Sequence, residues 1–142
     1  MMLKDILKNA SFILDDDTYR LLKLPPNAIT VSAAILAEVG EPFACLMVDK
    51  HEVTLVLEAE AYAEYRPRLL GHVVSEFAYS LITLDVALDP NVIGLTALLS
   101  RALADVNIPI IPLGSFSRDH FLVPQQRAND ALTVLNQLKS QD

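Results

Sequence analysis

The second half of the chain shows the clearest alternation of apolar and polar positions. Segment 79–89 predicts a strand, with one apolar face made by Ile82, Leu84, Val86 and Leu88. A helix is expected next, from a stripe at three- and four-residue spacing that comprises Leu95, Leu98, Leu99, Ala102, Leu103 and Val106. Strands 108–116 and 119–124 follow around a tight turn near Ser117 and Arg118, and an amphipathic helix covers 128–138.

Proline, glycine and aspartate residues in this half modify the pattern. Asp89, followed by Pro90, is expected to end the first strand and to cap the next helix. Gly94 falls in the first turn expected for that helix, where glycine is less favourable than alanine by about 1 kcal/mol. A backbone that lets another group come close would account for this glycine. Because proline cannot donate to a strand ladder, Pro109 and Pro112 predict an edge position for 108–116.

The first half predicts a weaker version of the same order. A short helix at 3–9 precedes it, and the acidic run Asp15-Asp16-Asp17 is expected as a solvated loop and not as a cation site. The elements expected after that run are strand 19–24, helix 30–39, a hairpin of strands 43–49 and 52–58 around Lys50-His51, and a short helix at 59–65.

Two copies of one strand–helix–strand–strand–helix pattern indicate an internal duplication. The pattern predicts an α+β, ferredoxin-like fold, in which each antiparallel sheet carries two helices. We expect an N-terminal unit at 1–72 and a C-terminal unit at 73–142. Because the sequence ends after a helix, the fourth strand of the second unit is expected from 71–78 or from a partner copy. Strand exchange and a homodimer are therefore expected.

Composition and charge exclude several kinds of partner. The net charge is −7 and no run of Lys or Arg occurs, so neither nucleic acid nor an anionic membrane surface is an expected partner. One cysteine rules out a disulfide within the chain, and with three scattered histidines it makes a zinc site improbable. No secretory signal pattern and no apolar stretch of ~18 residues is found, so a cytoplasmic protein is expected.

No arrangement of residues typical of catalysis is found in the sequence. It lacks a nucleophile elbow, a glycine-rich phosphate loop, a zinc-protease motif and a pair of cysteines at C-x-x-C spacing. We therefore expect no enzyme activity, no catalytic residue, no cofactor and no metal.

The segment LITLDVALDPNVIGLTALLSRALADVNIPIIPLGSFSRDHFLV resembles an ACT domain, the small-molecule-binding βαββαβ module of amino-acid metabolism. The order that carries the resemblance is a strand, Asp-Pro, a glycine at the helix start, ALADVNIPI, a Ser-Phe-x-x-Asp hairpin and FLVP. It covers 79–138 well, and more faintly the first half through YRLLKLPP and HEVTLVLEAE. The chain looks most like short tandem ACT proteins.

The resemblance implies a ligand site where the first helix of the unit begins. It places Val92, Ile93, Gly94 and Leu95 beside the ligand, together with the strand ends that carry Gly114, Ser115, Phe116 and Asp119; we add Asp89 at the start of the loop. Elementary electrostatics agrees, because a helix N-terminus suits a carboxylate and an acidic side chain suits an ammonium group. The first half lacks the equivalent glycine, so a twofold-equivalent site is not expected.

These observations predict a non-enzymatic, amino-acid-binding regulatory module, in which the ligand shifts the arrangement of domains or subunits. The expected partners are an amino acid or similar small zwitterion, a second copy of the chain, and an amino-acid biosynthetic enzyme. The alternative is a ligand-free dimerisation or protein-interaction module with the same fold.

Overall fold

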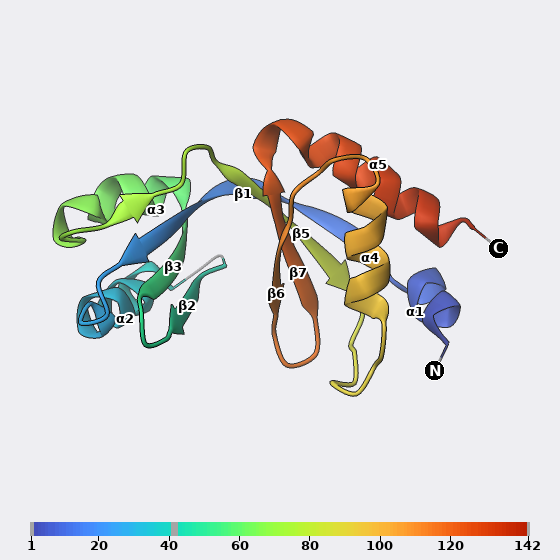
Figure 1. Cartoon of the computed structure of the whole chain (residues 1–142), viewed down its shortest axis with the longest axis horizontal. Helices are drawn as coiled ribbons and strands as arrows, with labels where there is room; N and C mark the ends of the chain where they lie inside the picture. The colour runs from blue at the N-terminus through green and yellow to red at the C-terminus, as the bar shows by residue number, and fades with distance from the viewer. Residues whose placement is uncertain (1, 41–42, 142) are drawn as a thin grey trace. The chain divides into compact units, whose positions relative to one another are not determined.

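The computed structural model describes residues 2–40 and 43–141 of the chain (Figure 1). They form two compact units, each with its own hydrophobic cluster. The terminal unit combines Met1–Asp16 with Ser80–Asp142, and the central unit is Asp17–Tyr79. These bounds differ from the expected 1–72 and 73–142, because the first residues of the chain belong with its last ones. Within the described residues, no helix is long and apolar enough to cross a membrane.

The central unit contains one complete βαββαβ order. Its elements are the 17–24 part of β1 (Ser11–Leu24), α2 (Ile29–Val39), β2 (Cys45–Val48), β3 (Val53–Glu58), α3 (Ala59–Tyr65) with a 3-10 turn (Arg66–Arg68), and β4 (Val73–Val74). The strand order is β2-β3-β1-β4 with antiparallel pairs, in which Leu22 lies opposite both Leu55 and Val74. The expected hairpin and the short helix that ends near Pro67 are confirmed.

The terminal unit contains the second copy. Its elements are α1 (Leu3–Asn9), the 11–16 part of β1, β5 (Tyr79–Asp85), α4 (Leu95–Ala104), β6 (Ile111–Gly114), β7 (Asp119–Pro124), a 3-10 turn (Gln125–Arg127) and α5 (Ala128–Lys139). The strand order is β6-β7-β5-β1. It equals the order of the central unit when β5 is counted as the first strand and β1 as the fourth. β6, with Pro112, is the edge strand, as expected.

The fourth strand of the terminal unit therefore comes from the start of the same chain. We expected it from 71–78 or from a partner copy, and the structure instead places β1 beside β5 while 73–74 complete the central sheet. The loop expected at Asp15-Asp16-Asp17 is wrong for the same reason. These residues lie in the middle of β1, where pairing of the backbone on both sides of them outweighs the low strand propensity of aspartate. Asp16 is exposed, and Asp15 and Asp17 are half-buried.

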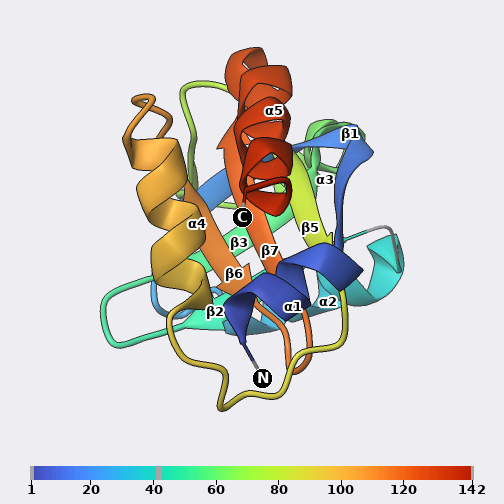
Figure 2. The ribbon, with the colours of Figure 1, turned by 90° about the vertical axis from the view of Figure 1, so that its right-hand side faces the viewer.

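Helices α4 and α5 lie side by side on one face of the terminal sheet (Figure 2). Their stripes are buried where the spacing predicted, at Leu95, Leu99 and Leu103 in α4 and at Ala128, Ala131 and Leu135 in α5. They pack on Ile82 and Leu84 of β5 and on Phe121 and Val123 of β7. This core fixes the start of α4 against the sheet, and it leaves the β5–α4 loop at the end of the strands.

Candidate functional site

The loop of residues 86–94 connects β5 to α4. The strand ends at Asp85, so Val86 and Leu88 lie in the loop and not on the expected strand face. The expected cap role of Asp89 is also wrong, because α4 begins only at Leu95. Asp89 instead forms a turn: its Oδ1 accepts a hydrogen bond from the N–H of Asn91 at 2.8 Å, and its carbonyl accepts from Val92 at 3.1 Å. Aspartate favours such turns as well as caps.

Gly94 precedes α4 and does not lie in its first turn. It has φ +88° and ψ −2°, a left-handed conformation that side chains disfavour. A Cβ built at this position would lie 3.6 Å from Cδ1 of Leu3, an ordinary van der Waals contact. The backbone conformation therefore accounts for the glycine more directly than the close approach of another group.

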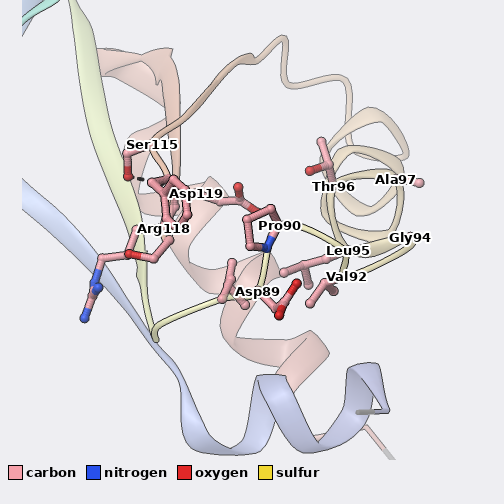
Figure 3. A pocket seen from close by; sticks show the side chains of 13 residues that line it. Asp89, Pro90, Val92, Gly94, Leu95, Thr96, Ala97, Ser115, Arg118 and Asp119 are labelled. Carbon is pink, nitrogen blue, oxygen red and sulfur yellow. Dashed lines mark hydrogen bonds between the residues drawn. The ribbon is translucent and has the colours of Figure 1, made fainter.

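A cleft of about 460 Å³ opens between this loop and the β6–β7 hairpin, and we call it the helix–hairpin cleft (Figure 3). It is lined by seven of the nine residues expected at the site, namely Asp89, Val92, Gly94, Leu95, Ser115, Phe116 and Asp119. Ile93 and Gly114 do not line it. The other lining residues are Leu88, Pro90, Thr96, Ala97, Ser117 and Arg118.

One wall of the cleft is the N-terminus of α4. The first backbone N–H groups of a helix have no intrahelical acceptor, and here no side chain caps them. Leu95, Thr96 and Ala97 line the cleft at this end, and the N–H of Leu98 is the first to bond within the helix, to Gly94 at 3.0 Å. The positive end of the helix dipole therefore faces the cleft.

The opposite wall is the β6–β7 hairpin, which has hydrogen bonds across its own turn and a backbone hydrogen bond from the loop. Ser115 donates to the carbonyl of Arg118 through its N–H at 2.9 Å and through its hydroxyl at 3.1 Å. The N–H of Leu88 donates to the carbonyl of Ser117 at 2.7 Å. Nε of Arg118 lies 3.1 Å from Oδ1 of Asp85, an ion pair that turns the guanidinium away from the cleft (Figure 3).

Asp119 brings an acidic group to this wall. Burial raises the pKa of its carboxyl above the usual value, and the neighbouring His120 opposes the shift. Within the described residues its carboxylate has no hydrogen bond or ion pair, and Figure 3 shows it directed toward Pro90 and the α4 side. A partly desolvated carboxylate without a donor gains interaction energy when a cation arrives.

His120 lies behind Ser115 and was not among the expected site residues. Its Nδ1 is 2.8 Å from Oγ1 of Thr83, and its Nε2 is 3.4 Å from Oγ of Ser115. Burial lowers its pKa, which favours the neutral ring. The imidazole thus lies within hydrogen-bond distance of the hairpin hydroxyl of Ser115.

Two of the lining residues that were not expected follow from where α4 begins. Thr96 and Ala97 line the cleft because α4 starts at Leu95, one residue after the left-handed Gly94. A glycine placed directly before an apolar-periodic segment is a signal for such a start, and it could have shifted the expected site toward these residues.

Comparison with known proteins gives the family of the second half. Residues 74–137 match the model of the ACT domain. None of the curated proteins compared with the chain matches it.

Solved structures cover nearly the whole chain. A Vibrio cholerae protein of unknown function, described as a possible transport protein, is 27% identical, with a TM-score of 0.75 over 97% of this chain and 96% of that one. An Agobacterium tumefaciens protein is 16% identical, with a TM-score of 0.72 over 92% and 89%. The regulatory subunit of aspartate kinase from Thermus flavus is 17% identical, with a TM-score of 0.67 over 89% and 95%. With its two βαββαβ units and the match over residues 74–137, this chain is similar to ACT-domain proteins.

Proposed function

We propose that the chain is a regulatory module without catalytic activity that binds an amino acid, or a similar small zwitterion, in the helix–hairpin cleft. One observation carries the proposal: the uncapped N-terminus of α4 and the unpaired carboxylate of Asp119 line the same cleft. A zwitterion presents the two opposite charges that these groups attract.

Each end of the ligand has a place in this cleft. Its carboxylate accepts hydrogen bonds from the first N–H groups of α4, at Leu95, Thr96 and Ala97. Its ammonium group lies against Asp119, beside the hydroxyl of Ser115. Phe116 at the tip of the hairpin is 87% exposed, so its ring is available to cover an apolar ligand side chain.

The regulatory part of the proposal is supported by fold and family. ACT domains are small-molecule-binding modules, and this fold occurs in regulatory subunits of aspartate kinase. The ligand would act by a population shift, favouring one arrangement of units or of two copies of the chain. A cytoplasmic enzyme of amino-acid biosynthesis is the partner that we propose to respond to that arrangement.

A thermal-shift screen against the common amino acids tests ligand binding. At 100 times its Kd, a ligand stabilises the folded state by about 2.7 kcal/mol. At least one amino acid is expected to raise the Tm clearly. If none does so, the zwitterion-binding proposal is wrong.

The variant Asp119→Asn tests where the ligand binds. It keeps the size of the side chain and removes the charge, and we expect about a tenfold or greater loss of affinity for a charge-assisted hydrogen bond. Asp105→Asn is the matched control, because it removes the same charge at the far end of α4. Equal affinity in the two variants would place the ligand elsewhere.

The pH dependence of binding should report the same carboxyl group. Because burial raises the pKa of Asp119, binding should weaken on acidification at a higher pH than for an ordinary aspartate, with its pKa of about 3.9. Calorimetric titration from neutral pH downward measures this loss, and the variant Asp119→Asn should lack this part of the pH dependence.

A module that only binds proteins is the second candidate. It is favoured by two large apolar side chains close to the cleft, Ile93 (88% exposed) and Phe116 (87% exposed). Sedimentation of the wild type and of the double variant Ile93→Ser, Phe116→Ser distinguishes the candidates. A dimer that the double variant loses, together with no response to any amino acid, would favour this second candidate.

A further inference from the structure

A second cleft in the terminal unit lies between loop 86–94 and helix α1, and we call it the α1 cleft. It has a volume of about 460 Å³. Helix α1 is additional to the βαββαβ order, and Ile6 and Leu7 anchor it in the core of this unit. The α1 cleft is therefore a feature of this chain that the repeated topology does not by itself produce.

The walls of the α1 cleft are mainly apolar. Ile6 contributes from α1, and Val86, Leu88 and Val92 contribute from the loop. All four belong to the hydrophobic cluster of the terminal unit or pack against it, so the walls are supported from behind. An apolar body of a few carbon atoms would be desolvated here, and burial of its surface favours binding.

Three polar side chains line the α1 cleft: the carboxylate of Asp89 and the amides of Asn9 and Asn91. Oδ1 of Asp89 accepts from the N–H of Asn91, and Nδ2 of Asn9 donates to the carbonyl of Asp5 at 2.9 Å. In the part of the chain that the structure describes, no donor reaches Oδ2 of Asp89 or Oδ1 of Asn9. No lysine or arginine lines the α1 cleft. Figure 3 shows the Asp89 carboxylate on the α1 side of the loop, away from that of Asp119.

We propose that the α1 cleft binds a small amine with an apolar body. The ammonium group donates hydrogen bonds to Asp89 and to the side-chain carbonyl of Asn9, and the apolar body lies against Ile6, Val86 and Leu88. A cation matches the single unneutralised charge and the two open acceptors, whereas a carboxylate would face repulsion from Asp89.

The probe for the experiment is 3-methylbutylamine, followed by ¹H–¹⁵N NMR of the full chain. The amides of Ile6, Asn9 and Val86 should shift with saturable binding, and those of Thr96 and Ser115 should change little. Two compounds of matched shape serve as controls, the neutral 3-methylbutan-1-ol and the anionic 4-methylpentanoate, and both should bind at least tenfold more weakly.

The variant Asp89→Asn tests the charge. Its amide oxygen can still accept from Asn91, so the turn and the spectrum should persist while amine affinity falls about tenfold. Asp105→Asn should bind the amine as the wild type does. The proposal is overturned if the amine does not bind, if the alcohol or the carboxylate binds equally well, if Asp89→Asn has no effect, or if the shifts gather at Thr96 and Ser115.

The two clefts share Leu88, Asp89 and Val92, but the two proposals predict different responses. An amino acid in the helix–hairpin cleft should shift Thr96 and Ser115 and depend on Asp119, whereas the amine should shift Ile6 and Asn9 and depend on Asp89. Failure of either proposal therefore leaves the other open to its own measurement.

Discussion

The two units repeat one topology, but the clefts at corresponding positions differ in chemistry. In the terminal unit, loop 86–94 and the β6–β7 hairpin form a cleft of about 460 Å³ that includes the first turn of α4. In the central unit, the end of β1, the β2–β3 hairpin and the segment before β4 form a cleft of about 350 Å³, lined by Lys23, Leu24, Pro25, His51, Glu52 and Gly71. No residue of α2 lines this cleft of the central unit.

The connections explain part of the difference. Residues 25–28 join β1 to α2 and include Pro25 and Pro26, which have no N–H to donate. Loop 86–94 is longer and ends in the left-handed Gly94, which leaves the N–H groups of α4 directed at the cleft. The shared topology thus brings a loop opposite a hairpin in both units, and the loop decides whether backbone donors are available.

The hairpin acids differ as well. Asp49 accepts hydrogen bonds from the N–H groups of His51 at 2.7 Å and Glu52 at 2.9 Å, and these bonds lower its pKa. Asp119 has no such donors among the described residues, and burial raises its pKa. The first carboxylate is already satisfied by its own turn, so only the second stands to gain from a bound cation. This contrast supports a single zwitterion site in the chain.

The largest predicted effect tests whether the two cores are separate. Leu99 of α4 and Ile35 of α2 are both fully buried, each in the cluster of its own unit. Leu99→Ala and Ile35→Ala should each lower the free energy of unfolding by about 2–5 kcal/mol. Hydrogen exchange should accelerate mainly in α5 and β7 for the first variant and mainly in β3 for the second. Equal acceleration in both units by either variant would show one cooperative core.

A smaller effect is predicted for two glycines of the terminal unit, Gly94 and Gly114. Gly94→Ala should lower the free energy of unfolding by about 1–2 kcal/mol, because alanine is strained at φ +88°. Gly114→Ala is the matched control: its φ is not positive, and its Cβ would lie 3.9 Å from Oδ1 of Asp119. Urea unfolding should show a change within about 0.5 kcal/mol for the control. Equal stability of the two variants would contradict the left-handed conformation of Gly94.

The smallest predicted effect is on the pH dependence of stability. It has opposite signs for the two hairpin acids, Asp119 and Asp49. The raised pKa of Asp119 means that its contribution to stability falls as the pH rises from its unfolded value of about 3.9 through its folded value. The lowered pKa of Asp49 means that its contribution is present above about 3.9 and is lost as the pH falls through the folded value.

At neutral pH, Asp119→Asn should therefore raise the Tm slightly and Asp49→Asn should lower it slightly. Below both pKa values of each group, every variant should approach the wild type. Thermal unfolding from pH 7 downward measures the two differences, and a shift of the same sign for both acids at pH 7 would remove the contrast between the hairpins.

Local sequence patterns predicted the elements well. The stripe of α4 and that of α5 are buried at their central positions, and the edge position of β6 follows from proline chemistry alone. Errors gather where two local signals compete. Asp89 suits both a cap and a turn, and only the position of the first helical hydrogen bond decides between them.

Seven of the nine residues expected at the site line one cleft, because the ordered motif around Gly94 and the Ser-Phe-x-x-Asp hairpin places loop and hairpin at one end of the sheet. Ligand binding by these residues stays a prediction. The α1 cleft was not predictable, because α1 meets loop 86–94 only through packing in the core. Nothing in a pattern of three or four residues reports a contact between segments so distant in the chain.

The sequence alone determined the repeated order of strands and helices, since periodicity and turn residues act over a few neighbours. Only the tertiary structure decided which strand completes each sheet. The acidic run at 15–17 looks like a break by composition, yet it is the middle of β1, because residues 11–16 and 17–24 find hydrogen-bonding partners in different units. Strand pairing between segments far apart in the sequence satisfies the backbone hydrogen bonds there. Local propensity does not include the energy of that pairing.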